Sequence, residues 1–260
     1  MINSKSQYAI FPFLVDKIRD SYLKTDKFSK LLETYTNKYS RINNFNTQKF
    51  WDSKFEDPEK IDDQDGMTKE KIDFIISQLP KKKSKILDLG IGQGYLEQRL
   101  KQLKIKHDTY GIDISKESIE RSKQNFKGQY KVGDVLDIHK YYKNLTFDVI
   151  VAIEVIEHIS SSQIFDLYKK IHNLLKPNGV FIISTPINEG LTPHTPNPSA
   201  HVRQYTIPIL RFEFDHAKFR VNKIKTTIAF KNFYMLKKIL SKIIFWKWQP
   251  NNVVIVAKKV

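Results

Sequence analysis

The hydrophobic pattern of the chain changes near residue 66. Before that point the sequence is polar and rich in Lys and Asn, and its apolar positions between Phe13 and Leu23 follow helical spacing. After it, short apolar runs alternate with amphipathic stretches, as strands and helices do in an α/β protein. We therefore expect an N-terminal mainly helical or irregular extension, residues 1–66, followed by one α/β domain, residues 67–260.

The apolar runs predict strands, and the stretches between them predict helices. Strands are expected at residues 85–90, 107–115, 129–135, 147–154, 180–186, 219–230 and 251–259. Helices are expected at residues 67–80, 95–104, 116–126, 163–176, 206–214 and 233–248. The alternation over most of the domain predicts a parallel sheet with helices on both faces. The last two strands lack a full crossover between them, so we expect them to be antiparallel to each other.

A glycine-rich turn follows the first predicted strand. The sequence ILDLGIGQGY places Gly90, Gly92 and Gly94 between that strand and the next helix. Glycine lets the backbone turn sharply and lets a ligand approach its N–H groups, while the helix N-terminus attracts an anionic group. Tyr95 stands where a dinucleotide-binding fingerprint has its third glycine, and the Gly-Lys-Ser/Thr of a phosphate-binding P-loop is absent. The turn therefore predicts a ligand other than a dinucleotide or a P-loop triphosphate.

Acidic residues stand at the ends of the next two predicted strands. Asp113 lies 23 residues after Gly90, where a carboxylate accepts hydrogen bonds from both hydroxyls of a ribose. Asp134 follows the third strand, where a side-chain acceptor reaches the amino group of an adenine. Each acid alone also suits a strand-end cap or a turn. Two of them at successive strand ends, with the glycine turn, favour an adenosine site.

The fourth predicted strand ends in the string Glu-Val-Ile-Glu-His, residues 154–158. If a helix begins here, Glu154, Glu157 and His158 share one face, at the edge of the sheet where α/β proteins bind ligands. Two carboxylates and an imidazole in that place are typical of a proton-abstracting base or of a site for a hard metal ion. A structural interpretation competes, with Glu157 at a helix N-terminus.

These features together resemble the class I S-adenosylmethionine-dependent methyltransferases. The resemblance rests on Asp88, the three glycines, the two strand-end acids and the strand FDVIVAIE, and it covers about residues 67–260. It implies a Rossmann-like sheet of seven strands, mostly parallel, with an antiparallel last strand. It also implies that the glycine turn and Asp88 hold the methionine part of S-adenosyl-L-methionine. The other residues that it assigns to the cofactor are Asp113 for the ribose, Asp134 with Val135 for the adenine, and Ile114 and Glu154 nearby.

The Glu-x-x-Glu-His string resembles two subgroups of these enzymes. One comprises the ubiquinone-biosynthesis O-methyltransferases and related enzymes that modify small molecules and glycans. The other comprises small-RNA 2′-O-methyltransferases, which bind a divalent metal ion through this string and a later histidine, here His194 or His201. The segments STP, residues 184–186, and HVRQYT, residues 201–206, are more similar to the first subgroup, so we expect no metal. The alternative is a metal site of Glu154, Glu157, His158 and His201.

We predict methyl transfer to a hydroxyl of a small-molecule, glycan or lipid-linked acceptor. The protein holds the acceptor in line with the S–CH₃ bond, and His158, or Glu157 acting with it, removes the hydroxyl proton. The long loop from Ile187 to Gln204 is typical of a lid or a substrate wall. The candidates for contact with the acceptor are His201, Arg203, Tyr205 and Trp51. Trp51 either closes over the cofactor or anchors the extension to the core.

The charge of the chain raises the question of a polyanionic partner. Lys and Arg number 44 and Asp and Glu number 28, which gives a net charge of +16, typical of binding to nucleic acid or an anionic membrane. Only seven of these cations are Arg, so the composition also fits the codon usage of an AT-rich genome. The segment 233–248 is basic and amphipathic, and it predicts either peripheral membrane contact or a core-packed helix with solvated lysines.

The sequence also bears on location. It contains no cysteine, which fits a reducing compartment. Its N-terminal apolar run is short and broken by Pro12, and no uninterrupted run of about 18 apolar residues occurs, so we expect neither a signal peptide nor a transmembrane helix. We expect a cytoplasmic protein, with peripheral membrane contact as an alternative. An RNA acceptor, N- or C-methylation, and a binding protein without activity stay open.

Overall fold

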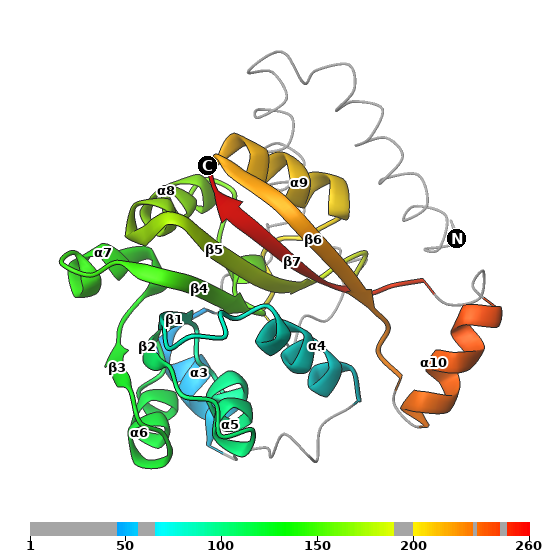
Figure 1. The fold of residues 1–260 in the computed structure, drawn as a ribbon, viewed down its shortest axis with the longest axis horizontal. Helices are drawn as coiled ribbons and strands as arrows, with labels where there is room; N and C mark the ends of the chain where they lie inside the picture. Colours follow the sequence, from blue (N-terminus) through cyan, green and yellow to red (C-terminus); the bar gives the residue numbers. More distant parts are fainter. Residues whose placement is uncertain (1–45, 57–65, 190–199, 231–232, 245–248) are drawn as a thin grey trace.

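A seven-stranded sheet forms the centre of the molecule (Figure 1). The structure, a computed structural model, describes residues 46–56, 66–189, 200–230, 233–244 and 249–260. The strands, in chain order, are β1 (Lys85–Leu89), β2 (Asp108–Asp113), β3 (Gln129–Val132), β4 (Phe147–Ile153), β5 (Leu175–Pro186), β6 (Phe219–Thr227) and β7 (Asn252–Lys259). The helices predicted before residue 46 lie outside the described residues.

The strand order is β3-β2-β1-β4-β5-β7-β6. Strands β1 to β5 pair in parallel, whereas β7 pairs antiparallel with both β5 and β6. This confirms the predicted α/β sheet, mostly parallel with an antiparallel last strand. The chain order reverses between β1 and β4, and α/β sheets bind ligands outside the carboxyl ends of the strands at such a reversal.

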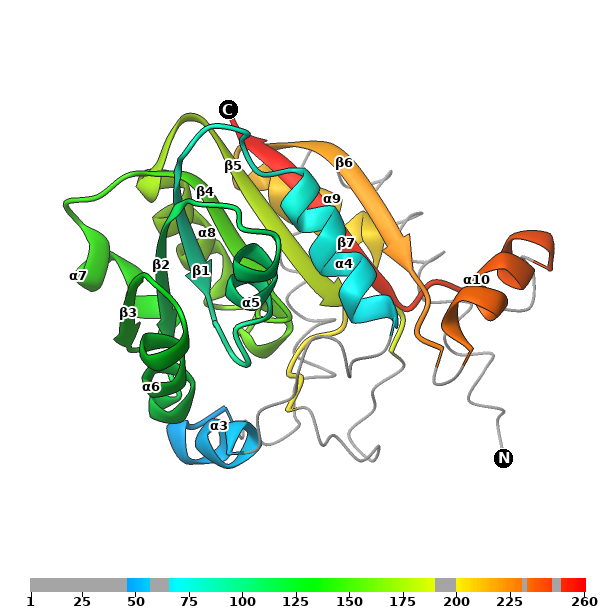
Figure 2. The ribbon, with the colours of Figure 1, turned by 60° about the horizontal axis from the view of Figure 1, so that its bottom comes forward.

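The strands are buried because helices cover both faces of the sheet. The described helices are α3 (Gln48–Phe55), α4 (Gly66–Ser77), α5 (Tyr95–Gln102), α6 (Lys116–Asn125), α7 (Ile138–Tyr142), α8 (Ile164–Leu174), α9 (Ile207–His216), α10 (Tyr234–Ile243) and two short 3₁₀ turns, η2 (Val135–Asp137) and η3 (Ile156–His158). Figure 2 shows α4 lying along the sheet, and α4 and α5 bury their apolar residues on that face. Helices α7, α8 and α9 cover the opposite face.

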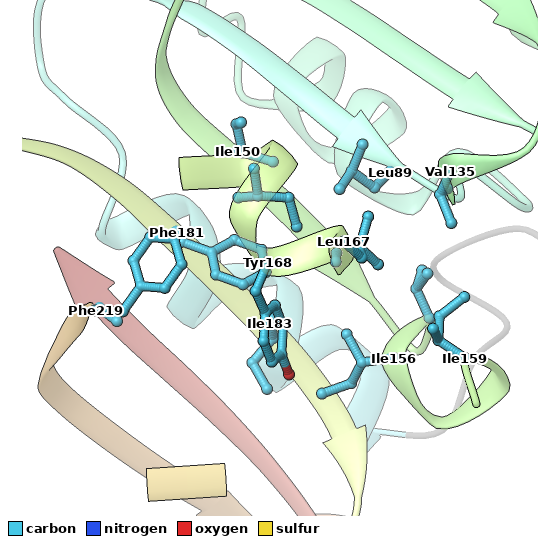
Figure 3. Close-up of a cluster of buried hydrophobic side chains, with 14 of the residues drawn as sticks. Leu89, Val135, Ile150, Ile156, Ile159, Leu167, Tyr168, Phe181, Ile183 and Phe219 are labelled. Carbon is cyan, nitrogen blue, oxygen red and sulfur yellow. The ribbon is translucent and has the colours of Figure 1, made fainter. Parts of the chain in front are cut away.

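Successive residues of β1 show how the two faces form. Ile86 packs with α4 and α5, and its neighbour Leu87 packs in the cluster beneath α8, because side chains alternate along a strand. Figure 3 shows part of this second cluster, where Tyr168 of α8 lies beside Phe181 of β5. Each fully buried apolar side chain of this size contributes about 1.5–3 kcal/mol. The two clusters fix the positions of the strand ends that carry the polar residues.

Two local differences from the predicted elements matter for the site. The expected helical start after β4 is absent: Glu154 adopts a left-handed backbone conformation, with φ of 54°, and only the short η3 follows. Strand β5 starts at Leu175 instead of residue 180, and the β4–β5 register shifts between Phe147 and Val149. Residues 154, 157 and 158 therefore do not share one helix face.

The N-terminal and C-terminal additions differ in how they pack. Helix α3 lies against α6, where the Ser115 hydroxyl donates to the Asp52 carboxylate at 2.7 Å. Helix α10 projects beyond the end of β6 and contacts α4 (Figures 1 and 2). It buries no residue, which contradicts the expectation of a core-packed helix. Among the helices that the structure describes, none has the length and apolar character needed to cross a bilayer.

Candidate functional site

A cavity of about 550 Å³ opens at the carboxyl ends of β1, β2 and β4. Most of the residues predicted for the site line it, although they come from distant parts of the sequence. They are Trp51, Asp88, Gly90, Gly92, Asp113, Ile114, Asp134, Val135, Glu154, His158 and His201. Four predicted residues do not line it, namely Gly94, Glu157, Arg203 and Tyr205.

The glycine turn forms the floor of the cavity between β1 and α5. Gly90 has φ of 70°, and a Cβ atom there would lie 2.6 Å from the Val155 side chain. Gly94 precedes α5 with φ of 73°, and a Cβ atom there would lie 2.7 Å from Phe126. A positive φ and this close approach both exclude a larger residue. Gly94 therefore shapes the turn, although it does not line the cavity.

Asp113 organises the turn from the end of β2. Its carboxylate accepts from the Gly92 N–H at 2.7 Å and from the Ser115 N–H at 2.8 Å. Burial raises the pKa of Asp113 to about 6, although these hydrogen bonds oppose the shift. One carboxylate thus fixes two neighbouring loops and still has lone pairs for a ligand. Asp134 has a related local role, because it accepts from the Leu136 N–H at 2.8 Å and caps η2.

Asp88 carries a buried oxygen that has no hydrogen-bond partner among the described residues. Its side chain lies at the cavity wall and is only 2% exposed. Burial raises the pKa of Asp88 well above its usual range, and the nearby carboxylates of Glu97 and Asp113 raise it further. A buried, unpartnered carboxyl is costly unless a donor or cation meets it. The site therefore fits a ligand that carries an ammonium group.

Glu154 is held by three elements that meet at the end of β4. Its Oε1 accepts from the Lys71 ammonium at 2.9 Å, the Ser184 hydroxyl at 2.6 Å and the Asn252 amide at 3.1 Å. Burial alone would raise the pKa of Glu154, but the Lys71 charge and these hydrogen bonds lower it overall. Sequence reasoning missed Lys71 and Asn252. The available signal was a lysine adjoining the apolar positions of the predicted helix 67–80.

Glu157 does not line the cavity and anchors the following loop. Its side chain is fully buried and accepts from the Thr185 hydroxyl at 3.0 Å. Its backbone carbonyl accepts from the N–H groups of Val202 and Arg203, at 2.9 and 3.1 Å. Burial and the Glu154 charge raise the pKa of Glu157 to about 8, so the carboxyl is protonated at neutral pH. It does not fit the predicted role as a base that faces the acceptor.

Two histidines whose pKa values are shifted in opposite directions line the cavity. His158 and His201 lie edge to face with their ring centroids 5.0 Å apart. Burial lowers the pKa of His158 to about 4, helped by the charge of His201. Burial also lowers the pKa of His201, but the hydrogen bond to Glu189 at 2.7 Å and the surrounding carboxylates more than offset this and raise it. Near neutral pH His158 is therefore uncharged, beside the more basic His201.

The orientation of His158 follows from its neighbours. Its Nδ1 lies 3.2 Å from the Ala200 carbonyl oxygen, so a neutral ring carries its proton there and leaves Nε2 as the acceptor. The Trp51 ring packs edge to face against it at 4.9 Å between centroids. Trp51 in turn stacks on Phe55, also in α3 and at the cavity. The N-terminal helix thus forms a wall of the same cavity.

Arg203 and Tyr205 belong to a buried network that includes Tyr168 of α8 and Glu213 of α9. Arg203 is 1% exposed and pairs with Glu213 of α9, and it also donates to the Tyr205 hydroxyl at 2.5 Å. The Tyr168 hydroxyl donates to the other oxygen of Glu213 at 3.1 Å. The expectation that Arg203 and Tyr205 contact an acceptor is therefore corrected. A loop position predicted their exposure, but the loop turns inward at this point.

Three of the four residues of the alternative metal site lie together. Ligand atoms of Glu157, His158 and His201 lie within 4.8 Å of one another. Glu154 is not part of this group and is bound instead by Lys71. His194, the other histidine considered for this role, lies outside the described residues.

Comparisons with known proteins agree with this geometry. A family model described as a methyltransferase domain matches residues 80–233. The chain is 33% identical over 172 residues to a ubiquinone biosynthesis O-methyltransferase of Pelagibacter ubique, and the match covers 62% of each chain. It is 29% identical over 103 residues to the protein of that name from Bradyrhizobium diazoefficiens, covering 39% of each. The matched region thus spans less than two thirds of the length of these relatives.

Solved structures share the fold at low sequence identity. The N-methyltransferase NodS of Bradyrhizobium japonicum, in complex with S-adenosyl-L-homocysteine, aligns with a TM-score of 0.58 and 13% identity, covering 82% of this chain and 98% of that one. A SAM-dependent methyltransferase of Archaeoglobus fulgidus aligns with a TM-score of 0.57 and 19% identity, covering 74% and 92%. These likenesses concern the arrangement of the sheet and helices.

Proposed function

The chain belongs to the class I S-adenosylmethionine-dependent methyltransferases, and we propose that it methylates a hydroxyl oxygen of a small aromatic molecule. The single observation that carries the proposal is His158, a neutral imidazole on the wall of the cavity that adjoins the glycine turn. The relatives named ubiquinone biosynthesis O-methyltransferases support oxygen as the accepting atom. We place the reaction in the cytoplasm, because a chain without cysteine suits a reducing compartment.

The chain's own residues fit the cofactor. The orphaned oxygen of Asp88 suits the ammonium group of the methionine part, and the N-terminus of α5 suits its carboxylate. Asp113 retains lone pairs for the ribose hydroxyls, and Asp134 with Val135 stands where the adenine fits. When bound, S-adenosyl-L-methionine supplies a methyl group attached to a positively charged sulfur. The sulfur is a good leaving group because it departs as a neutral thioether.

His158 supplies the proton acceptor for the transfer. Its Nε2 would accept the proton of the acceptor hydroxyl, while S-adenosyl-L-methionine, held by the glycine turn, Asp88 and Asp113, would supply the methyl group. A positioned general base contributes about 10²–10⁴-fold to the rate, and this contribution is largest when the pKa of the base lies near the operating pH. The pKa of His158, about 4, lies below that, so its position rather than its basicity carries the effect. His201, which is held by Glu189 and whose pKa is raised by that hydrogen bond and by nearby carboxylates, lies beside His158 on the same wall of the cavity.

Apolar side chains support an aromatic acceptor. Trp51, Phe55 and Ile159 line the cavity, and Trp51 packs directly against His158. Flat aromatic rings pack well against such residues in offset or edge-to-face arrangements. Holding the acceptor between this wall and the sulfur aligns the oxygen with the S–CH₃ bond, and this alignment is itself a large part of the catalysis.

The test uses labelled S-adenosyl-L-methionine and three acceptor probes of different chemistry. These are a catechol, an aromatic amine of similar size and a short RNA oligonucleotide. The proposal expects label on the catechol oxygen, located by mass spectrometry of the product. Label on the amine or on the RNA, with none on the catechol, would contradict it. A His158→Gln variant, which has no basic nitrogen at this position, controls for uncatalysed transfer.

A further inference from the structure

Helix α10 presents its apolar side to solvent. Met235, Leu236, Ile239 and Ile243 are 66%, 57%, 56% and 67% exposed, and Phe233, just before the helix, is 77% exposed. With about 100° between successive residues, these side chains fall on one half of the helix. A cluster of large apolar residues on one exposed face is unusual for a surface that meets only water.

The polar side of α10 is the side that is attached to the protein. The Tyr234 hydroxyl and the Lys238 ammonium donate to the Glu70 carboxylate of α4, at 2.6 and 2.5 Å. Lys225 of β6 pairs with the same carboxylate at 2.7 Å. Burial raises the pKa of Glu70, but its three partners more than offset this and lower it to about 2, so Glu70 stays ionised. These contacts hold the helix with its apolar half outward, the reverse of an ordinary surface helix.

The charge around this helix points to an anionic partner. The last 45 residues of the sequence contain 11 Lys and Arg and no Asp or Glu. They account for most of the net charge of +16. Lys242 is exposed and lies next to the apolar half of the helix, with Lys237 on its opposite border. An apolar strip bordered by lysines matches the interface of a bilayer, where acyl chains lie beneath negatively charged headgroups.

We propose that α10 docks the protein on an anionic lipid membrane, with Met235, Leu236, Ile239 and Ile243 inserted among the acyl chains. Lys237 and Lys242 then lie at the level of the headgroups. The helix α4 that holds α10 through Glu70 also lines the cavity with Thr68 and Lys71. Docking therefore brings the cavity close to the membrane surface. The docking itself does not depend on the proposed acceptor.

The test is flotation of the full chain with lipid vesicles. Vesicles of phosphatidylcholine alone are compared with vesicles of equimolar phosphatidylcholine and phosphatidylglycerol. The wild type is expected to float with the anionic vesicles and far less with the neutral ones. The double variant Ile239→Asp/Ile243→Asp is expected to lose at least about tenfold in binding, because its apolar strip is interrupted. Lys237→Gln/Lys242→Gln is expected to lose about fivefold for each lysine.

Two matched control variants distinguish the role of the apolar half of α10 and its bordering lysines from a general effect of the change in charge. Leu103→Asp/Ile105→Asp changes the charge equally at exposed apolar positions after α5, and Lys123→Gln/Lys127→Gln removes two exposed lysines at and beyond the end of α6. Both are expected to bind vesicles like the wild type, and all variants are expected to bind S-adenosyl-L-methionine unchanged by calorimetry. A wild type that does not float with anionic vesicles, or an α10 variant that floats equally well, overturns the proposal. Light scattering tests the alternative occupant. If the wild type is a dimer and Ile239→Asp/Ile243→Asp is a monomer, the apolar half of α10 is instead a contact with a second copy of the chain.

Discussion

The two ends of the cavity are built in different ways. At the glycine turn, Asp113 contacts the N–H of Ser115 two residues away and of Gly92 on the adjacent loop. At the histidine end, His158 contacts Ala200, 42 residues further along the chain. The first end is held by local backbone geometry at neighbouring strand ends. The second end depends on a loop that returns to the sheet after a long excursion.

This difference has a chemical counterpart. The end at the glycine turn carries the carboxyls of Asp88, Asp113 and Asp134, which we propose to be the contacts of the cofactor. The histidine end combines the neutral imidazole of His158, the more basic His201 and the Trp51 ring of α3. Because loops vary more readily than strand ends, we propose that the histidine end selects the acceptor. Mutations at the two ends should therefore separate cofactor binding from transfer.

Replacing His158 by Ala is expected to give the largest effect. Transfer to the catechol probe should fall about 10²–10⁴-fold, because the proton acceptor is lost. The affinity for S-adenosyl-L-methionine, measured by calorimetry, should change by less than about threefold, a factor worth under 1 kcal/mol. His172→Ala, on the half-exposed side of α8, provides the control. Equal losses of transfer in the two variants would remove His158 from the mechanism.

The pH dependence of the wild type tests the same residue. With a pKa of about 4, His158 stays neutral from about pH 6 to about pH 8. The base form is then fully populated, so lowering the pH within this range should not reduce the transfer rate through His158. A rate that follows the protonation of His158 near pH 6.5, observed by NMR of its ring, would contradict the buried position assigned to it.

Replacing Asp113 by Ala addresses the cofactor end. The variant loses its acceptors for the ribose and for two loop N–H groups, so the affinity for S-adenosyl-L-methionine should fall about hundredfold, on the scale of two hydrogen bonds to a charged group. The control is Asp108→Ala, at the opposite end of the same strand, where the Asp108 carboxylate pairs with the exposed Lys83. Calorimetry should find that this control binds normally. Normal binding by Asp113→Ala would exclude the proposed ribose position.

The same contrast explains what could be predicted from the sequence. The strands of the sheet follow from the periodicity of apolar residues, and the glycine turn and the strand-end acids adjoin those strands in the sequence. The positions of Asp113 and Asp134 could therefore be predicted from the sequence alone. The orientations of Glu157 and Arg203 could not, because they depend on partners such as Thr185 and Glu213 in later elements. The left-handed backbone at Glu154 also broke the assumed helical spacing. Long-range packing decides those positions.

The variant Glu157→Gln tests whether this buried acid is structural. The pKa of Glu157 is about 8 in the folded protein against an ordinary 4.5, so between these values the folded state holds one proton more than the unfolded state. Stability therefore falls as pH rises through that window, by at most about 1.4 kcal/mol per pH unit. Gln keeps the neutral form, so the Tm of the variant should fall less than that of the wild type between about pH 6 and about pH 8.

The matched control for this measurement is Glu120→Gln on the exposed face of α6. It should follow the wild-type pH dependence. A stability difference of 1 kcal/mol corresponds to about 2–4 °C in Tm for a chain of this size, so the effect is measurable by scanning calorimetry. If Tm changes with pH equally in Glu157→Gln and in the wild type, Glu157 is ionised in the folded protein.

Chelation is expected to give the smallest effect. Glu157 is protonated and bonded to Thr185, and Glu154 is bound by Lys71, so the base function needs only His158. Dialysis against EDTA should leave transfer to the catechol probe within about twofold of the untreated enzyme, since no ligand bond is lost. A large loss that is restored by added Mg²⁺ or Zn²⁺ would assign Glu157, His158 and His201 to a metal site.

A crystal structure with S-adenosyl-L-homocysteine is the most direct test that the cofactor lies along the glycine turn with its sulfur beside His158, because this experiment needs no knowledge of the acceptor. We expect the adenine to lie beside Asp134 and Val135, the ribose hydroxyls to bond Asp113, and the amino group to bond Asp88. We also expect the sulfur to face the open space next to His158. A ligand bound outside the cavity, or a sulfur turned away from His158, would contradict the account.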